Sequence, residues 1–289
     1  MDVKGIVLAG GKGTRFRPAT MATNKHLLAV YDKPMIFYPL SLLMLADLRD
    51  ILLITSPRDV ARFQDLLGDG SRFGVNLSYA TQEEPRGLPE AYLIGERFLD
   101  GHPSCLVLGD NIFYGQGLPT IITRGFTRKS GAGIFVCEVD NPQDYGVARF
   151  DSEGRVTELL EKPRSPASDL VVTGLYYFDA TAPARARTLT PSARGELEIL
   201  DLATQYLREG QLSVEQLGRG IAWLDMGSPD ALIMASNLIH VIDHRQRLKI
   251  ACLEEIAWRK GWIDDTTLRQ AADVFADTAY GRYILRLLA

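Results

Sequence analysis

The stretch VKGIVLAGGKGTR, residues 3–15, decides how this chain is expected to fold. It begins with an apolar run from Val3 to Ala9, which is typical of a buried strand, and it ends in a glycine-rich turn. Glycines carry no Cβ, so their backbone amides can approach an anion closely. The stretch therefore predicts a phosphate-binding loop at the end of a strand, although a tight strand-to-helix turn without a ligand would use the same glycines.

This loop differs from the two common nucleotide-binding motifs. Phe16 stands where the dinucleotide fingerprint GxGxxG needs its third glycine, and no Gly-Lys-Ser/Thr sequence of a P-loop occurs. The missing glycine, together with the lack of an acidic ribose partner at the expected spacing, argues against a dinucleotide-dependent oxidoreductase. Lys12, Arg15 and Lys25 bring positive charge close to the glycines, which favours a triphosphate, and Arg15 can contact a phosphate with two nitrogens.

Short apolar runs alternate with helical patterns in the first half of the chain, which predicts a parallel sheet with right-handed crossovers. One helix is expected to begin at Asp32 with Pro34 in its first turn, and another near Ser56, which precedes Asp59 at capping spacing. Beyond residue 140, shorter runs indicate a mixed sheet inserted over the first. The expected strands are residues 3–9, 51–55, 75–80, 105–108, 134–139, 147–150, 155–160 and 171–178.

The C-terminal part of the chain is expected to be helical. From Pro229 onward apolar residues recur at helical spacing, and residues 250–289 have little strand character. No internal repeat or low-complexity linker separates independent domains. The pattern predicts one large α/β domain followed by a helical appendage.

Composition excludes several classes of protein. Of the 289 residues, 46% are hydrophobic and 24% charged, which is the balance of a soluble globular protein rather than a disordered or fibrous one. The net charge of -4 gives no basic field for nucleic acid, and no apolar stretch approaches the roughly 20 residues that span a bilayer. Cys105, Cys137 and Cys252 lie far apart among apolar neighbours, which is typical of reduced thiols. We expect a cytoplasmic protein that binds neither nucleic acid nor membrane.

Carboxylates at two predicted strand ends are candidate metal ligands. Asp110 follows the strand at 105–108, and Asp225 follows another apolar run, so the two can bind Mg²⁺ while water and phosphate complete its shell. A carboxylate in this position is also a common turn or helix cap. Glu161 and Lys162 close the strand at 155–160, either as a surface ion pair or as ligands of a sugar hydroxyl and a phosphate.

Longer motifs carry a resemblance to a known family. With LAGGKGTR at residues 8–15 and KHLLAVYDKPM at 25–35, the chain resembles the sugar-1-phosphate nucleotidylyltransferases, in particular the glucose-1-phosphate thymidylyltransferase branch. The likeness runs nearly end to end. It returns in LGDGS (67–71), LGDNIFYG (108–115), EKP (161–163), VTGLY (172–176) and PSARGELEI (191–199).

The resemblance implies a fold and a reaction. The fold is a Rossmann-like, three-layer α/β core with a mixed central sheet over residues 1–228, with the nucleotide half at about 1–110 and an inserted sugar-binding half at about 111–228. Helices at 229–289 would serve assembly, as a homotetramer, and regulation. The implied reaction joins dTTP and α-D-glucose 1-phosphate into dTDP-glucose and pyrophosphate with Mg²⁺ as cofactor, and it feeds deoxysugar biosynthesis.

The resemblance also assigns roles to individual residues. The implied nucleotide contacts are Leu8, Gly10, Gly11, Gly13, Thr14, Arg15, Lys25 and His26, with Gln82 and the backbone of Gly87 on the thymine edge. The implied sugar and sugar-phosphate contacts are Asn111, Gly146, Glu161, Lys162, Val172, Tyr176 and Arg194. Asp110 and Asp225 would bind the metal, and the expected catalytic set is Arg15, Lys25, Asp110, Lys162 and Asp225.

Such a site needs alignment and charge neutralisation rather than a general base. The attacking group is already an anionic phosphate oxygen, so it must be held behind the α-phosphorus while Arg15 and Lys25 stabilise the departing pyrophosphate. We expect direct in-line displacement without a covalent enzyme intermediate.

Several positions depart from the family pattern. His26 and Ala29 stand where the closest thymidylyltransferases have Gln and Pro, and Pro85 to Glu90 replaces a Pro-Asp-Gly-Leu-Ala-Gln type of segment. His26 can donate one hydrogen bond and titrate near neutral pH, or it is an uninvolved surface side chain. Met226 and Ser228 flank the metal candidate Asp225 where small polar residues are usual. The choice between dTTP and UTP, and between hexose and amino-hexose phosphates, stays open, as does a non-catalytic nucleotide-sugar-binding subunit.

A second, regulatory site is a further hypothesis. Family members are commonly inhibited by a downstream dTDP-sugar that binds near Tyr114 and Gly115 and the C-terminal helices. Glu255, Ile256 and Arg259 partly share one helix face there. Packing between subunits of a tetramer would explain the same residues.

Overall fold

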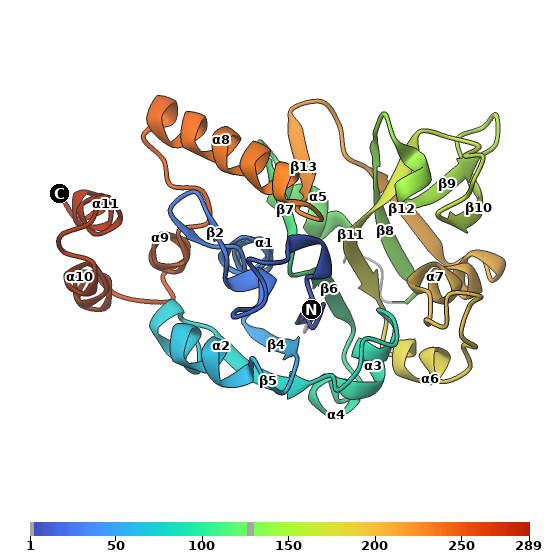
Figure 1. Cartoon of the computed structure of the whole chain (residues 1–289), viewed down its shortest axis with the longest axis horizontal. Helices are drawn as coiled ribbons and strands as arrows, with labels where there is room; N and C mark the ends of the chain where they lie inside the picture. Colours follow the sequence, from blue (N-terminus) through green and yellow to red (C-terminus); the bar gives the residue numbers. More distant parts are fainter. Residues whose placement is uncertain (1–2, 126–129) are drawn as a thin grey trace.

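The computed structural model describes residues 3–125 and 130–289 and is built around one mixed β-sheet (Figure 1). Four of its strands are parallel neighbours in the order β6-β1-β4-β5, and each lies within one residue of its predicted bounds. They are β1 (Lys4–Ala9), β4 (Asp50–Thr55), β5 (Asn76–Thr81) and β6 (Ser104–Leu108). The glycine-rich turn after β1 therefore opens at the carboxyl edge of parallel strands, where open α/β sheets bind ligands.

Strand β11 (Leu170–Phe178) joins the parallel half to a second, mostly antiparallel half. Its last residues pair with β6, its first residues with β9 (Gly146–Phe150), and both its ends with β8 (Ala132–Glu138). Beyond these, β10 (Val156–Glu161) pairs with β9, and β12 (Leu212–Gln216) runs parallel to β8. The second group of strands continues the same sheet, because β11 is long enough to pair with both halves. The expectation of a separate sheet lying over the first is wrong.

Two small two-stranded sheets lie outside the central sheet. In one, β7 (Asn111–Gly115) pairs antiparallel with β13 (Ile221–Asp225), which joins segments far apart in the sequence. The other is β2 (Ala29–Val30) with β3 (Lys33–Pro34), turning at Tyr31, whose φ is 60°. The helix expected to begin at Asp32 is therefore a hairpin, and α1 (Phe37–Leu45) begins only after it. Asp32 accepts hydrogen bonds from lysine side chains instead of capping a helix.

Helices cover both faces of the sheet and give three layers. Adjacent strand residues point to opposite faces: Ile6 belongs to a core shared with α3 and α7, whereas Val7 belongs to a core shared with α1 and α2. Helix α2 begins at Val60, later than predicted, because the Ser56 hydroxyl donates to the Asp59 carboxylate instead of capping the helix. The helices of this part of the chain are α2 (Val60–Leu67), α3 (Glu90–Ile94), α4 (Glu96–Leu99), α5 (Leu118–Gly125), α6 (Ala182–Ala186) and α7 (Ile199–Arg208). Short 3₁₀ turns are η1 (Thr14–Phe16), η2 (Lys25–Leu27), η3 (Ser71–Phe73) and η4 (Pro142–Asp144).

The C-terminal region is helical, as predicted. It consists of α8 (Pro229–Gln246), α9 (Leu253–Arg259), α10 (Asp265–Val274) and α11 (Ala279–Leu287). The Ser228 hydroxyl caps α8 by accepting a hydrogen bond from the backbone amide of Ala231 at 3.2 Å. Helix α9 packs on α1, and α10 and α11 form a pair beside it (Figure 1). Within residues 3–125 and 130–289, no helix combines the length and the apolar character needed to cross a bilayer.

Candidate active site

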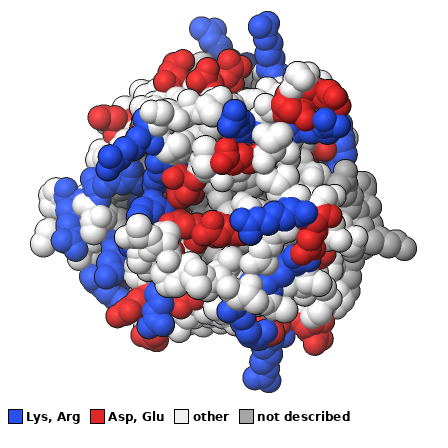
Figure 2. Space-filling view, turned by 90° about the vertical axis from the view of Figure 1, so that its right-hand side faces the viewer, with Lys and Arg blue, Asp and Glu red and all other residues white. Residues whose placement is uncertain are grey.

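A large pocket of about 990 Å³ lies at the carboxyl edge of β1 and β6 and extends to the antiparallel strands. It collects residues from the glycine-rich turn, β7, β9, β10, β11, β13 and the first turns of α8. Outside it, acidic and basic side chains are interspersed on the face that carries β9 and β10 (Figure 2). Surface ion pairs such as Arg155 with Asp151 contribute to this pattern.

Most of the residues proposed from the sequence line this one pocket. They are Leu8, Gly10, Gly11, Arg15, Lys25, His26, Gln82, Gly87, Asp110, Asn111, Gly146, Glu161, Lys162, Val172, Tyr176, Arg194 and Asp225. Gly13 and Thr14 lie outside the lining. Gly13 has a φ of 57°, and a Cβ there would lie 3.0 Å from the Thr20 methyl carbon and 3.2 Å from Lys25 Cβ. Its role is to let the loop turn tightly above Lys25.

The pocket lining contains an ion pair between Lys25 and Asp110. Lys25 lies in η2, and its ammonium contacts Asp110 Oδ2 and the carbonyl of Met226 at 3.4 Å. Burial raises the pKa of the Asp110 carboxyl, but Lys25, His26 and the hydrogen bonds from Lys25 and Asn111 together hold that pKa below its ordinary value. Asp110 is therefore ionised and fixed at the end of β6.

Asp225 brings a second carboxylate to the same place. It ends β13 and pairs with Asn111 in β7, and the backbone amide of Met226 donates to the Asp110 carbonyl at 2.9 Å. Burial and the neighbouring Asp110 raise the pKa of Asp225 to about 6, although Lys25, Arg15 and Lys162 oppose the shift. The site thus carries negative charge that a bound cation would relieve.

The donor set fits a divalent metal only in part. No group of three or more His, Cys, Asp or Glu side chains that could hold a metal occurs among the described residues. Two carboxylates can nevertheless anchor a hard cation such as Mg²⁺, which keeps several waters and takes its remaining ligands from substrate phosphates. Asp110 and Asp225 fit that open arrangement.

A hydrogen-bond chain through Asn111 fixes the Asp110 carboxylate. Asn111 Nδ2 donates to Asp110 Oδ1 at 3.1 Å, and Asn111 Oδ1 accepts from Trp223 Nε1 at 2.6 Å and from the Gly174 amide at 3.3 Å. A Cβ on Gly174 would lie 2.7 Å from the Asn111 amide, so glycine is required there. Trp223 was not predicted from the sequence, and only its place in the strand before Asp225 hinted at it.

Glu161, Lys162 and Arg194 form another charged part of the pocket lining. Lys162 turns sharply after β10 with a φ of 45°, and its amide donates to the Tyr145 carbonyl at 3.0 Å. Arg194 Nη2 donates to Glu161 Oε1 at 3.1 Å and to Glu198 Oε2 at 2.7 Å. Burial and Glu198 raise the pKa of Glu161. Arg194 is therefore neutralised by carboxylates, whereas Lys162 faces the pocket.

His26 is a buried part of the pocket wall rather than a surface side chain. It is 3% exposed, its Nδ1 lies 2.8 Å from Asn24 Oδ1, and its backbone amide donates to the same oxygen at 2.9 Å. Burial and then Lys25 lower its pKa to about 4. The expectation that it titrates near neutral pH is wrong, because the ring is desolvated beside a cation. A Cβ on Gly109 would lie 2.7 Å from its ring, so the two segments are in close contact.

Gln82 and Gly87 form the end of the pocket near the glycine-rich turn. Gln82 Nε2 donates to Glu90 Oε2 at 2.6 Å, and a Cβ on Gly10 would lie 2.7 Å from Gln82 Oε1. The amide is therefore oriented, with its oxygen toward the loop. Gly87 has a φ of 114° and bridges to Leu197, whose carbonyl would lie 2.1 Å from a Cβ on Gly87.

The candidate regulatory side chains Glu255 and Arg259 in α9 already form hydrogen bonds within the chain. Glu255 is 4% exposed and accepts hydrogen bonds from the Tyr283 hydroxyl and, at 2.7 Å, from Arg259 Nε. Near the other proposed segment, the Tyr114 hydroxyl donates to Gln246 Oε1 at 2.9 Å. These contacts tie α9 to α11 and β7 to α8.

Comparisons with known proteins point to one family. Residues 4–241 match the family model described as nucleotidyl transferase. The chain is 52% identical over 286 residues to a glucose-1-phosphate thymidylyltransferase of Neisseria meningitidis, with 99% of both chains covered. It is 53% identical to one of Xanthomonas campestris, over 98% of this chain and 96% of that one.

Solved structures give the same picture. A glucose-1-phosphate thymidylyltransferase structure from Bacillus anthracis, in complex with sucrose, superposes with a TM-score of 0.76 at 37% identity, covering 82% of this chain and 94% of that one. A UDP-glucose pyrophosphorylase complexed with UDP-glucose gives a TM-score of 0.74 at 25% identity, covering 83% of this chain and 99% of that one.

Proposed function

The chain belongs to the nucleotidyl transferase family, in its glucose-1-phosphate thymidylyltransferase group, and we propose that the pocket joins dTTP and α-D-glucose 1-phosphate into dTDP-glucose and pyrophosphate. The observation that carries this proposal is the gathering of two charged groups of residues in one pocket. The first group is Lys25, Asp110 and Asp225, and the second is Glu161 and Lys162 at the end of β10. The first group suits a triphosphate with its metal, and the second suits a phosphorylated sugar.

The nucleotide enters along the glycine-rich turn. Gly10 and Gly11 leave the backbone open to phosphates, and Arg15 lies beside Gly227 near Asp225. Gln82 is oriented by Glu90, so its carbonyl oxygen can accept the N3–H of thymine or uracil, which cytosine lacks. This contact accounts for the selection of a base with N3–H and leaves dTTP and UTP equivalent at that atom.

The chain's own residues position the reaction. Lys162 and the neighbouring Glu161 hold glucose 1-phosphate so that one of its phosphate oxygens lies behind the α-phosphorus of the nucleotide. The new bond joins that oxygen to the α-phosphorus, and the bond from the α-phosphorus to the bridging oxygen of pyrophosphate breaks. Arg15 and Lys25 offset the charge that grows on the departing pyrophosphate. No general base is required, because the attacking oxygen is already an anion.

A divalent cation, which we propose to be Mg²⁺, is held by Asp110 and Asp225 and neutralises phosphate charge when bound. The raised pKa of Asp225 supports this assignment, since the two neighbouring carboxylates repel each other until a cation joins them. When no cation is bound, the Lys25 ammonium offsets part of the negative charge of the two carboxylates.

The same family membership supports further assignments for the whole chain. Residues 1–228 form the catalytic region, with a nucleotide half up to about residue 110, and residues 229–289 serve assembly. The enzyme works in the cytoplasm as a homotetramer, and a downstream dTDP-sugar inhibits it at the α9 region. The engaged side chain of Glu255 means that such a ligand would have to share or displace the Tyr283 contact.

Pyrophosphate release by the purified protein tests the proposal. The protein is given α-D-glucose 1-phosphate with dTTP, UTP, ATP, CTP or GTP in turn, with Mg²⁺ or with chelator. Metal-dependent release with dTTP, and formation of dTDP-glucose by mass spectrometry, is the expected result. Release with UTP alone would change the nucleotide assignment. Silence with all five, but dTDP-glucose binding, would indicate a non-catalytic regulatory subunit.

A further inference from the structure

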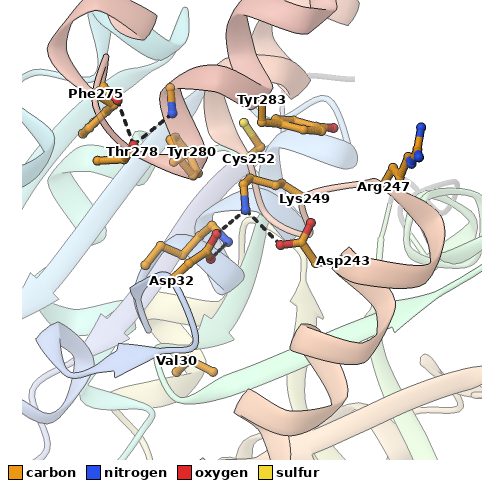
Figure 3. A network of polar contacts seen from close by, with 12 residues as sticks. Val30, Asp32, Asp243, Arg247, Lys249, Cys252, Phe275, Thr278, Tyr280 and Tyr283 are labelled. Carbon is orange, nitrogen blue, oxygen red and sulfur yellow. Dashed lines mark hydrogen bonds and ion pairs between the residues drawn. The ribbon is translucent and has the colours of Figure 1, made fainter.

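One ring nitrogen of His26 is available to a ligand, unlike the buried charges elsewhere in the chain. Lys249, at the centre of the cluster in Figure 3, donates to Asp32 at 2.6 Å and to Asp243 at 2.9 Å, so its charge is matched within the chain. The His26 ring lines the pocket, and among the described residues only its Nδ1 has a hydrogen-bond partner. The Nε2 atom is therefore left for a bound molecule.

The Nε2 atom of His26 is open to the pocket rather than enclosed in the core. Within residues 3–125 and 130–289, the fully enclosed side-chain polar atoms without a partner are the hydroxyl oxygens of Tyr92 and Ser104, and Nε2 is not one of them. A Cβ on Gly109 would lie 3.0 Å from Nε2, so the glycine leaves this side of the ring uncovered. A ligand in the pocket can reach the nitrogen there.

Asn24 determines which nitrogen of His26 carries the proton. Asn24 Nδ2 donates to Asp59 Oδ2 at 2.9 Å and to the Ala9 carbonyl at 3.3 Å, and both of these oxygens are acceptors. Asn24 Oδ1 therefore faces His26, where it also accepts the backbone amide at 2.9 Å. An amide oxygen cannot donate, so His26 Nδ1, which lies 2.8 Å from it, must carry the ring proton.

Neighbouring hydroxyl groups hold both acceptors of Asn24 in place. The Ser56 hydroxyl donates to Asp59 Oδ2 at 2.7 Å, and the Thr55 hydroxyl donates to the Ala9 carbonyl at 3.1 Å. Turning the Asn24 amide over would set its oxygen against a carboxylate and a carbonyl, and it would leave the His26 backbone amide without its acceptor. The orientation of Asn24, and with it the ring tautomer of His26, is therefore fixed.

A neutral imidazole with its proton on Nδ1 offers the pocket a hydrogen-bond acceptor at Nε2 and no donor. Burial and the neighbouring Lys25 keep the His26 ring neutral, with a pKa of about 4. Phosphate oxygens also accept hydrogen bonds, so Nε2 is unsuited to the triphosphate. Its partner must be a group that donates, such as a hydroxyl.

The order of residues along the carboxyl edge of the sheet indicates which hydroxyl lies there. Gln82 follows β5 and reaches Gly10, which follows β1. His26 lies against Gly109, which follows β6, and Asp110 comes next. Under the proposed function Gln82 contacts the base, and Asp110 holds the cation that binds the phosphates. The deoxyribose joins the base to the phosphates, so it lies between these two groups, beside His26.

We infer that Asn24 is a positioning residue that holds His26 as a hydrogen-bond acceptor, and that His26 Nε2 accepts the 3′-hydroxyl of the nucleotide. The deoxyribose of dTTP has no other free hydroxyl, so this group is the one donor that the sugar can offer. The role rests on the proposed function, which supplies the nucleotide. It makes His26 an acceptor toward the ligand, because its one ring proton is used within the chain by Asn24.

Ring ¹⁵N NMR of the full chain with labelled histidine, at pH 7.5, tests the tautomer. The His26 signals are identified by their loss in His26→Gln, and we expect a protonated Nδ1 and an unprotonated Nε2. Asn24→Ala is expected to give a mixture of both tautomers, whereas Asn237→Ala, exposed on α8, is the matched control and leaves the signals unchanged. A protonated Nε2 in the parent chain, or an unchanged tautomer in folded Asn24→Ala, would overturn the inference.

Calorimetric titration with dTTP and with 2′,3′-dideoxythymidine triphosphate, in Mg²⁺ and without sugar phosphate, tests the partner. The parent chain is expected to bind the dideoxy nucleotide about tenfold more weakly, because Nε2 is left unpaired. His26→Leu, which has no acceptor, is expected to bind both nucleotides equally, whereas His102→Leu, outside the pocket lining, keeps the tenfold preference.

Two outcomes of the titration would overturn the inference. Equal binding of both nucleotides by the parent chain would show that Nε2 accepts from water instead, and this comparison needs no variant. A tenfold preference that persists in His26→Leu would show that the hydroxyl has another partner. Neither experiment uses turnover: the expected preference without pyrophosphate release would contradict only the proposed reaction, and turnover of dTTP with the other tautomer only the role of His26.

Discussion

The Lys25 ammonium is paired with the Asp110 carboxylate, and this pair stands directly beside Asp225, whose pKa is raised to about 6. Segments far apart in the sequence converge here, because β13 pairs with β7 immediately after Asp110. Lys25 is paired with Asp110, whereas Asp225 has no such direct partner and interacts with Lys25, Arg15 and Lys162 from a distance. The arrangement accounts for both the binding of a metal and the handling of phosphate in one small space.

Removing either carboxylate should impair metal-dependent turnover. Asp110→Asn and Asp225→Asn are each expected to lower kcat/KM about 100-fold or more, because each removes a charge that holds the cation where phosphate charge develops. Steady-state pyrophosphate release against Mg²⁺ concentration measures the effect. Asp273→Asn, exposed on α10, is the control. Full activity in either pocket variant would overturn the ligand assignment.

Lys162→Ala should weaken the binding of glucose 1-phosphate more than the binding of dTTP. Its ammonium is assigned to the sugar phosphate, so KM for glucose 1-phosphate is expected to rise roughly tenfold, which is about 1.4 kcal/mol, while KM for dTTP changes little. Initial rates with each substrate varied in turn provide the measurement. Equal increases in both KM values would contradict this division.

Trp223→Phe should loosen the orientation of the Asp110 carboxylate indirectly, through Asn111. The variant keeps an aromatic ring beside Tyr145 but removes the Nε1 donor that orients Asn111. Leaving the Asn111 oxygen short of a partner costs about 1–3 kcal/mol, so kcat is expected to fall roughly tenfold and the Mg²⁺ requirement to increase. Unchanged kinetics in a folded variant would show that Asn111 needs no such support.

Acid should destabilise the fold through His26. Its pKa is about 4 in the folded chain against 6.5 for an ordinary histidine, so the unfolded state binds more protons between these values. Stability from this group is complete above about pH 6.5 and is lost as pH falls toward 4, up to about 3 kcal/mol. Urea unfolding at pH 7.5 and pH 5 should show the loss in the parent chain and a smaller one in His26→Gln. Equal losses would mean that His26 is not the cause.

Gly87→Ala should disrupt the link between two pocket loops. A Cβ would lie 2.1 Å from the Leu197 carbonyl oxygen, in addition to the cost of the left-handed φ of 114°. We expect a loss of about 3 kcal/mol or more in unfolding free energy. Gly101→Ala, with a φ of 75° and open space around it, isolates the backbone cost of about 1 kcal/mol. Similar losses in both would argue against the clash.

The strands could be predicted from the sequence because their signal is local. Runs such as residues 51–55 and 105–108 are apolar apart from Thr55, as a parallel strand buried on both faces requires, and they are confirmed to within one residue. The helix predicted to begin at Asp32 is absent, because the contacts of Asp32 involve a residue far along the chain. Asp32 pairs with Lys249, which the sequence around Pro34 cannot reveal.

The site residues were found through motifs, whereas their partners were not. Asp110 and Asp225 follow strand-like runs, and the structure brings both into one pocket. Arg194 carries no local sign of Glu161 and Glu198, which occupy its guanidinium. Burial of His26 likewise depends on Asn24 and Gly109, so its low pKa is a property of the tertiary structure.

The stereochemistry at the α-phosphorus tests the central claim most directly, that this pocket transfers the nucleotidyl group in one in-line displacement. The purified enzyme is given one diastereomer of α-thio-dTTP with glucose 1-phosphate, and the configuration of the product is determined by ³¹P NMR. The account predicts inversion at phosphorus, because the sugar phosphate attacks opposite to the leaving pyrophosphate. Net retention would require two displacements through a covalent enzyme intermediate and would contradict it.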